Sequence, residues 1–313
     1  MGNRFLAAAA LAVYASATLV ADEPAAQRGS LSIPRVSVLY VSAVDRSGAP
    51  VTDLTASDIV LKEDGEIREI VKVQRATAQM HVALIIDDSG TGIFRYAVAN
   101  FVDQLLGRAQ FAIKRVVGQV LTLVDYTSDV DRLRQAVGLL KVMTETPKGG
   151  QIVEGIFEAS KELQRRAVER PVIVVFTDTD AEYSTLPASH VLNQLQQSGA
   201  RLYVISVAKM VQGTLPNSGV VPDKPSDLLD KAVDVNQVLG DGPKQSGGRR
   251  AEIIGTAGSV PALQQIGDEL KYQYVVTYIV PAGEKPNQKL NVTTKRRGVT
   301  VRAPARSGGG SPF

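Results

Sequence analysis

The chain has 313 residues, of which 44% are apolar, and this is enough for one large domain and a smaller one with proper hydrophobic cores. Its formal charge of +3 includes no long basic block, which excludes the electrostatic footprint of a nucleic-acid-binding protein. Cysteine is absent, so thiol catalysis, cysteine-ligated metals and disulfides are excluded as well. His81 and His190 are the only histidines available as catalytic bases.

The amino terminus has the pattern of an export signal. Arg4 supplies a positive charge, and residues 5–20 form an uninterrupted stretch of apolar and small residues. This stretch is shorter than the roughly 20 residues that a membrane-spanning helix needs. We therefore expect a signal peptide over residues 1–21 and no stable membrane span after its removal. A cysteine-free exported chain is typical of bacteria, so we expect a secreted or periplasmic bacterial protein.

The next two segments differ in composition. Residues 22–34 are polar and contain proline, and we expect a disordered linker there. Residues 35–77 alternate apolar with polar or small residues and contain turn signals at residues 45–48 and 63–66. This pattern predicts a small antiparallel β segment.

From residue 80 onward, apolar strands alternate with segments of helical periodicity. The predicted strands are 82–86, 120–126, 171–176, 202–207 and 272–280, and the predicted helices are 92–108, 131–143, 152–163, 188–198 and 261–270. Such alternation predicts an α/β domain over 80–280, with a doubly wound, mostly parallel sheet and helices on both faces.

Three further segments complete the expected organisation. Residues 211–250 are rich in Gly, Pro, Ser and Asp, and we expect a loop excursion with one short helix over 226–233. Residues 281–303 should form a carboxyl-terminal β segment that packs with residues 35–77 as a small antiparallel module. The Gly/Ser-rich end, residues 304–313, is expected to be a disordered tail.

Oxygen-bearing side chains follow the strand 82–86. Asp87, Ser89 and Thr91 occupy every second position, at the end of the strand where open α/β folds bind ligands. Their oxygens suit a hard cation such as Mg²⁺. A simpler alternative is that Ser89 or Thr91 caps the helix that follows. Asp178 ends the strand 171–176 and adds a second carboxylate at the same edge of the sheet.

Catalytic patterns are not found in the sequence. Ser89 lacks the Gly-x-Ser-x-Gly frame of a serine hydrolase, and no phosphate-binding P-loop pattern is present. His81 lies at the amino-terminal end of its predicted strand, away from Asp87. We therefore expect no enzymatic activity, with a divalent-metal hydrolase as the weaker alternative.

A series of motifs, in order along the chain, resembles the von Willebrand factor type A domain over roughly residues 80–280. The segments that carry the resemblance are 83–91, 121–127, 149–151, 174–178, 202–207, 246–249, 266–270 and 274–278. Residues 51–55 and 63–65 resemble the β segment that precedes such a domain in secreted bacterial proteins.

The resemblance implies a metal-ion-dependent adhesion site that binds Mg²⁺ or Mn²⁺. The family's first loop corresponds to Asp87, Ser89 and Thr91, and its third loop corresponds to Asp178. The family's second loop carries a Thr where this chain has Gln151. The amide oxygen of Gln151 can bind Mg²⁺, although its longer side chain must fold back to reach the ion.

The same resemblance implies a function in binding. We expect a secreted, non-enzymatic adhesion module whose degenerate metal site engages a protein partner, with a carboxylate of the partner completing the coordination. A structural or scaffold protein that has lost the metal is the alternative. Thr146 precedes the turn at residues 147–150 and is a possible substitute for the missing hydroxyl ligand.

Overall fold

The computed structural model describes residues 34–144, 150–178, 184–208, 225–284 and 288–307, with the backbone alone for 225–233. These residues belong to one compact unit. The predicted signal peptide, nearly all of the predicted linker and Thr146 lie outside the described residues, so the expectations for them stay predictions.

The centre of the α/β part is a six-stranded sheet with the order β10-β9-β8-β5-β6-β7. Its strands are β5 (Met80–Asp87), β6 (Ala109–Val117), β7 (Gln119–Thr127), β8 (Arg170–Thr177), β9 (Arg201–Ala208) and β10 (Arg249–Ile254). All neighbouring pairs are parallel except β6 and β7. Asp87 pairs with Thr177, so β5 and β8 end side by side at one edge of the sheet.

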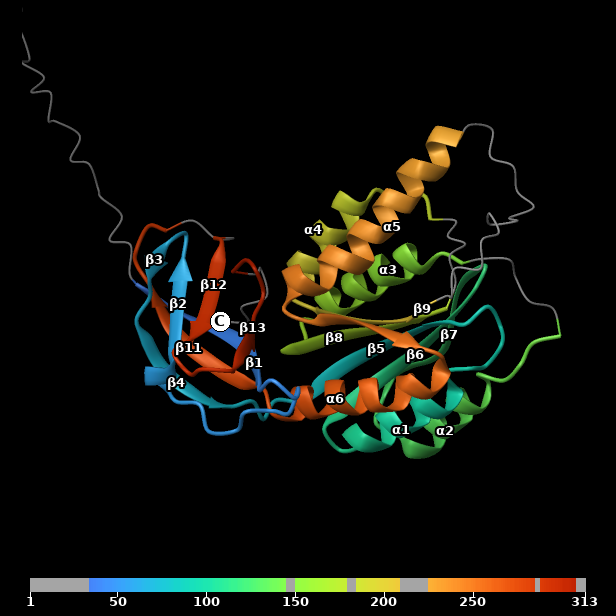
Figure 1. The fold of residues 1–313 in the computed structure, drawn as a ribbon, viewed down its shortest axis with the longest axis horizontal. Helices are drawn as coiled ribbons and strands as arrows, with labels where there is room; N and C mark the ends of the chain where they lie inside the picture. The colour runs from blue at the N-terminus through green and yellow to red at the C-terminus, as the bar shows by residue number, and fades with distance from the viewer. Residues whose placement is uncertain (1–33, 145–149, 179–183, 209–224, 285–287, 308–313) are drawn as a thin grey trace, which may run out of the picture. The chain divides into compact units, whose positions relative to one another are not determined.

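Helices cover both faces of this sheet (Figure 1). One face carries α1 (Arg95–Leu105), α2 (Val130–Gly138) and α6 (Ser259–Lys271), and the other carries α3 (Ile152–Arg165), α4 (Ala188–Ser198) and α5 (Pro225–Ser246). A hydrophobic core lies on each face of the sheet, and successive side chains of β5 alternate between them. Leu84 and Ile86 pack toward α1, whereas Ile85 packs toward α3. The predicted doubly wound, mostly parallel α/β fold is confirmed.

Two smaller antiparallel sheets form the second part of the fold. The first has the order β13-β1-β11-β4, from β1 (Arg35–Val44), β4 (Ile70–Arg75), β11 (Tyr274–Val280) and β13 (Thr300–Arg302). The second has the order β12-β2-β3, from β2 (Ile59–Glu63), β3 (Glu66–Ile67) and β12 (Leu290–Thr294). Short 3₁₀ turns occur at Ala56–Asp58 and Thr256–Gly258. Apolar side chains of both sheets share one core, which makes this the predicted antiparallel module.

The structure differs from the sequence-based prediction at several elements. β6 and β10 lie where no strand is predicted. β11 falls inside the predicted α/β range of 80–280, yet it pairs with β1 and β4 of the antiparallel module. The predicted tail begins at residue 304, but Ala305 hydrogen-bonds to Gln245 and Leu290, so the first residues of that segment are ordered.

The expected loop excursion over 211–250 is wrong for the part that the structure describes, because α5 spans 22 residues there. One glycine of α5 and one just beyond the end of the helix allow close packing on β9. A methyl group on Gly242 would lie 3.0 Å from the Leu202 side chain, and one on Gly248 would lie 2.0 Å from the Leu202 carbonyl oxygen. The Gly248 N–H donates to the Pro243 carbonyl at 2.8 Å and closes the end of the helix. Packing against β9 thus outweighs the low helix propensity of Gly and Pro.

Buried arginines join the antiparallel module to the start of the parallel strands. Arg170 begins β8 and donates to the Ala78 carbonyl at 2.7 Å and to Gln273 Oε1 at 2.9 Å. Arg201 begins β9 and donates to Ser42 Oγ at 3.1 Å and to the Tyr40 carbonyl. These contacts hold the module at the amino-terminal edge of the sheet, the edge opposite Asp87.

Gly248→Ala should destabilise the protein by about 1–3 kcal/mol, because the added methyl group meets backbone that cannot move freely. Gly240→Ala is the matched control: it lies in α5 with nothing within 4 Å of the added group, so it should stabilise by about 0.5–1 kcal/mol. Urea denaturation measures both free energies of unfolding. An unchanged midpoint for Gly248→Ala would contradict the packing of α5 on β9.

Candidate functional site

Asp87 is the last residue of β5 and points toward the face of the sheet that α3 covers. Its side chain is 2% exposed, and its Oδ2 accepts a hydrogen bond from Thr177 Oγ1 at 3.0 Å. The backbone N–H of Asp178 donates to the Asp87 carbonyl at 3.2 Å. The structure therefore brings the ends of β5 and β8 together, as the positions of Asp87 and Asp178 predict.

The turn before α3 approaches the same carboxylate. A methyl group on Gly150 would lie 3.3 Å from Asp87 Oδ1 and 2.4 Å from Val116 Cγ1, so a larger residue there would displace the Val116 side chain. Gln151 follows directly at the N-cap position of α3, and within the described residues its side chain makes no capping hydrogen bond. The three loops that carry Asp87, Gln151 and Asp178 thus lie at one edge of the sheet.

The loop after β5 is organised by Asp88, whose side chain is fully buried. Its carboxylate accepts hydrogen bonds from the N–H groups of Gly90 at 3.1 Å and Gly92 at 2.7 Å. Thr91 donates its hydroxyl to the Asp88 carbonyl at 2.7 Å. Ser89 adopts a left-handed conformation with φ of 48°, which is uncommon for a residue with a side chain.

The alternative that Ser89 or Thr91 caps the following helix is wrong. α1 begins at Arg95, and its N-cap residue is Phe94, for which no side-chain capping bond is found in the described part of the chain. The short polar residues of this loop are instead held by Asp88, and the Thr91 hydroxyl still has acceptor capacity for a cation.

A buried ion pair anchors this loop to the sheet. Arg115 on β6 binds Asp88 through Nε at 3.2 Å and through Nη2 at 3.0 Å. Its Nη1 donates to the carbonyls of Leu139 at 3.2 Å and Lys141 at 2.9 Å. One guanidinium therefore connects the loop after β5 with the segment after α2 and neutralises the Asp88 charge. Asp87, one residue earlier, points to the other face and takes no part in this pair.

Glu154 fixes the segment that follows Asp178. It lies in the first turn of α3, and its carboxylate accepts hydrogen bonds from the Thr185 N–H at 2.6 Å and from the Ser184 hydroxyl. The chain beyond β8 is thereby tied to the helix that begins beside Gln151. This bond keeps the second and third loops of the candidate site together.

Several residues that build the site are not predicted from the sequence. Thr177 directly precedes Asp178 at the end of an apolar strand, and this position is a signal that could have identified it. Asp88 has an equivalent signal next to Asp87. Arg115 has none, because the strand that carries it is not predicted.

The candidate ligands are of the chemical type that binds a hard divalent cation. Carboxylates of Asp87 and Asp178, hydroxyls of Ser89 and Thr91, and the amide oxygen of Gln151 are all oxygen donors of the kind that Mg²⁺ takes. Within the described ranges, no three His, Cys, Asp or Glu side chains gather as metal ligands. A cation here would therefore depend on hydroxyl groups and water beside the two carboxylates.

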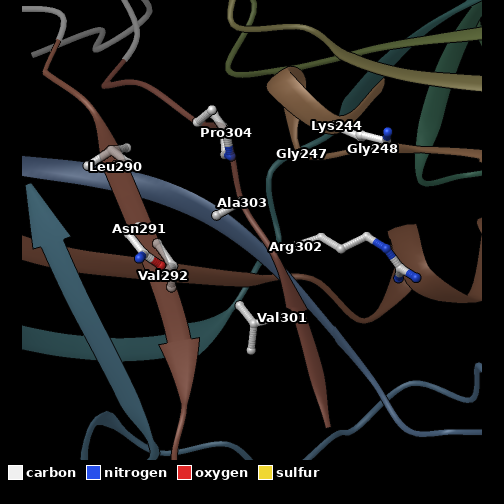
Figure 2. A pocket seen from close by; sticks show the side chains of 11 residues that line it. Lys244, Gly247, Gly248, Leu290, Asn291, Val292, Val301, Arg302, Ala303 and Pro304 are labelled. Carbon is white, nitrogen blue, oxygen red and sulfur yellow. The ribbon is translucent and has the colours of Figure 1, made fainter. Parts of the chain in front are cut away.

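A pocket of about 330 Å³ lies elsewhere, between the end of α5 and the strands β12 and β13 (Figure 2). Its walls include Leu290, Val292 and Val301. Figure 2 shows the Arg302 side chain extending away from β12, and its guanidinium binds Glu269 Oε2 at 3.0 Å. The charge of Arg302 is thus used inside the fold and is not directed at a ligand in this pocket.

His81 is not a base for the candidate site, because it lies near the start of β5, at the edge opposite Asp87. Its ring packs on Tyr126 with 5.6 Å between the ring centroids. Burial, followed by the positive charge of Arg166, lowers the pKa of His81 below its ordinary value of 6.5.

Replacing Arg115 should cost far more stability than replacing an exposed arginine. Arg115→Met leaves Asp88 charged and buried without its cation, and we expect a loss of about 3–5 kcal/mol. Arg134→Met is the control, since its pair with Asp131 is exposed and should be worth less than about 1 kcal/mol. Denaturant unfolding measures both. Adding Asp88→Asn to Arg115→Met should recover part of the loss, and equal stability of the two single variants would contradict the assignment.

Stability should fall in mild acid through His81. A lowered folded-state pKa means that this contribution is present above pH 6.5 and is lost as pH falls from 6.5 through the folded-state value. The urea midpoint of the wild type, followed between neutral pH and mild acid, should therefore drop more than that of His81→Phe. His190→Gln, which removes the exposed histidine of α4, should keep the wild-type drop. Identical profiles for wild type and His81→Phe would refute this assignment.

Comparisons with known proteins give structural matches only. Neither a protein-family model nor a curated protein sequence matches the chain.

The helices of the described residues include none with the length and apolar character of a membrane span.

Solved structures similar to this chain share low sequence identity with it. A von Willebrand factor type A protein from Catenulispora acidiphila is 10% identical, with 90% of this chain and 75% of that chain covered and a TM-score of 0.44. The vWF domain of the type V pili tip protein Mfa5 from Porphyromonas gingivalis is 12% identical, with 62% and 96% covered and a TM-score of 0.42. The conserved hypothetical protein BatB from Bacteroides thetaiotaomicron is 15% identical, with 62% and 99% covered and a TM-score of 0.39. Two of these three structures, from Catenulispora acidiphila and Porphyromonas gingivalis, are described as von Willebrand factor domains, the family that the sequence motifs resemble.

Proposed function

We propose that this chain is a secreted, non-enzymatic protein-binding module that presents a divalent cation at the sheet edge around Asp87. The observation that carries the proposal is that two neighbouring carboxylates have different surroundings. Asp88 is buried and neutralised by Arg115, whereas Asp87 faces the loops that carry Gln151 and Asp178. An ion pair thus holds the loop in place, while Asp87 accepts a hydrogen bond from Thr177 and lies beside the two other loops.

In this proposal the side chains hold Mg²⁺ or Mn²⁺ as follows. Ser89 and Thr91 ligate through their hydroxyls, and Asp87 and Asp178 act directly or through water. Mg²⁺ takes few protein ligands and keeps several waters, so exchangeable positions remain on the ion. A carboxylate of a protein partner fills one of them.

In this proposal, the coordination that Gln151 can offer determines whether the site still binds the metal ion. Its amide oxygen takes the place of a hydroxyl ligand, and Mg²⁺ demands near-ideal octahedral geometry. Within the described residues Gln151 has no capping role that would explain it otherwise. The competing proposal is a structural scaffold with the same fold and no cation.

Two further parts of the proposal rest on the sequence. Export is supported by the signal-like residues 1–21, which lie outside the described structure. A binding role without catalysis is supported by the position of His81, at the sheet edge opposite Asp87, and by the missing hydrolase and phosphate-loop patterns.

Thermal unfolding in the presence of Mg²⁺ or Mn²⁺ tests the proposal. A cation that binds only the native state stabilises it, by about 2.7 kcal/mol at a hundredfold excess over the dissociation constant. Millimolar metal should raise the melting temperature of the wild type, and Asp87→Asn should abolish the rise. Asp103→Asn, which removes an exposed carboxylate of α1, is the matched control and should respond like the wild type.

Gln151→Thr separates the competing proposals. A larger metal-induced rise than in the wild type supports a weak but working site. A rise in Gln151→Thr alone identifies a site that has lost its metal and favours the scaffold. If neither protein responds to millimolar metal, the cation site is rejected.

A further inference from the structure

Large apolar side chains are exposed around Arg115, beside the loop 88–92. Leu121 is 52% exposed, Leu139 is 53% exposed and Val142 is 71% exposed. Single exposed apolar residues are ordinary, but several grouped at one place mark an interaction site. We call these three residues the apolar ridge.

Contacts of the described residues place the ridge together. Leu121 on β7 pairs with Arg115 on β6, so the two side chains lie on the same face of the sheet. Arg115 Nη1 in turn donates to the carbonyls of Leu139 and Lys141, which immediately precedes Val142. The ridge therefore comes from β7 and from the segment after α2, joined by one buried guanidinium.

The ridge is continuous with the candidate site. A methyl group on Gly92 would lie 2.9 Å from the Leu140 carbonyl oxygen and 3.2 Å from the Val142 nitrogen, so the two segments are in backbone contact. The Met143 N–H donates to the Gly90 carbonyl at 2.8 Å. A partner that reaches Ser89 and Thr91 therefore also reaches Val142.

Two exposed cationic side chains lie beside the ridge in the described part of the chain. Lys141 is exposed between Leu139 and Val142, Arg95 is exposed at the start of α1, and within the described residues neither makes an ion pair. Asp88, which lies behind the ridge next to Arg115, is buried and already neutralised by it. Charge complementarity thus favours an acidic partner segment.

We propose that the apolar ridge is the part of the docking surface that selects the partner: a protein segment with an acidic side chain next to large apolar ones. This inference rests on the proposed function, since the acidic side chain engages the cation at Asp87 while the apolar neighbours cover the ridge. Burial of exposed apolar surface then supplies affinity, and the carboxylate supplies position.

Selection from a displayed library of random linear peptides, with Mg²⁺ present, tests the ridge. Enriched peptides should combine Asp or Glu with neighbouring large apolar residues. Fluorescence anisotropy of labelled, enriched peptides should show binding at least roughly tenfold weaker for Leu139→Ser/Val142→Ser than for the wild type. Ile67→Ser/Val71→Ser is the matched control, because these residues are 71% and 56% exposed on the antiparallel module and should leave binding unchanged.

The outcomes separate the ridge from the cation. Leu121→Ser gives a second, independent loss at the ridge, and thermal unfolding checks that each variant is folded. If chelation of Mg²⁺ or Asp87→Asn abolishes binding while the ridge variants bind like the wild type, the cation proposal stands and the ridge is rejected. If the ridge variants lose binding and chelation has no effect, the ridge stands and the cation role fails. Enrichment of no peptides, or of peptides without acidic residues, overturns the inference.

Discussion

The buried ion pair between Asp88 and Arg115 is the constraint on which the candidate site depends. A buried carboxylate is costly unless a cation and hydrogen bonds compensate it, and Asp88 has both from Arg115, Gly90 and Gly92. Because alternate side chains of a strand point to the same face, Asp87 points toward α3 as Ile85 does, whereas Asp88, the next residue, is held by Arg115. The same guanidinium holds the carbonyls of Leu139 and Lys141, so the loop after β5 and the segment after α2 are held as one surface.

One edge of the parallel sheet contacts the antiparallel module, and the other edge carries the candidate site. At the amino-terminal edge, Arg170 and Arg201 bind carbonyl and side-chain oxygens of the antiparallel module, and burial lowers the pKa of Arg170 to about 10. At the other edge, β5 and β8 end in Asp87 and Thr177, where an open α/β sheet offers its ligand crevice. The module therefore stabilises the fold without covering the edge that we propose binds the partner.

The sequence predicts the parallel strands β5, β8 and β9 and the positions of Asp87 and Asp178 at strand ends, because uninterrupted apolar runs are strong local signals. It does not predict β6, since Lys114 and Arg115 interrupt the apolar run over 109–117. Both are buried through contacts with Glu162 and Asp88, which are distant in sequence. Nor does it predict the length of α5, because the Gly and Pro residues of this helix indicate a loop, and the close packing of Gly242 against Leu202 is not visible in the sequence. The strand β6 and the length of α5 therefore depend on packing and ion pairs between residues that are distant in sequence.

Anomalous diffraction from crystals grown with Mn²⁺ tests the different roles of Asp87 and Asp88. The claim is that Asp88 organises the loop while Asp87 faces the cation. We expect one anomalous peak at bonding distance from the Ser89 and Thr91 hydroxyls, with Asp87 and Asp178 bound to it directly or through water and Arg115 still paired with Asp88. An ordered loop without a peak, or a peak bound to the Asp88 carboxylate in place of Arg115, would contradict it.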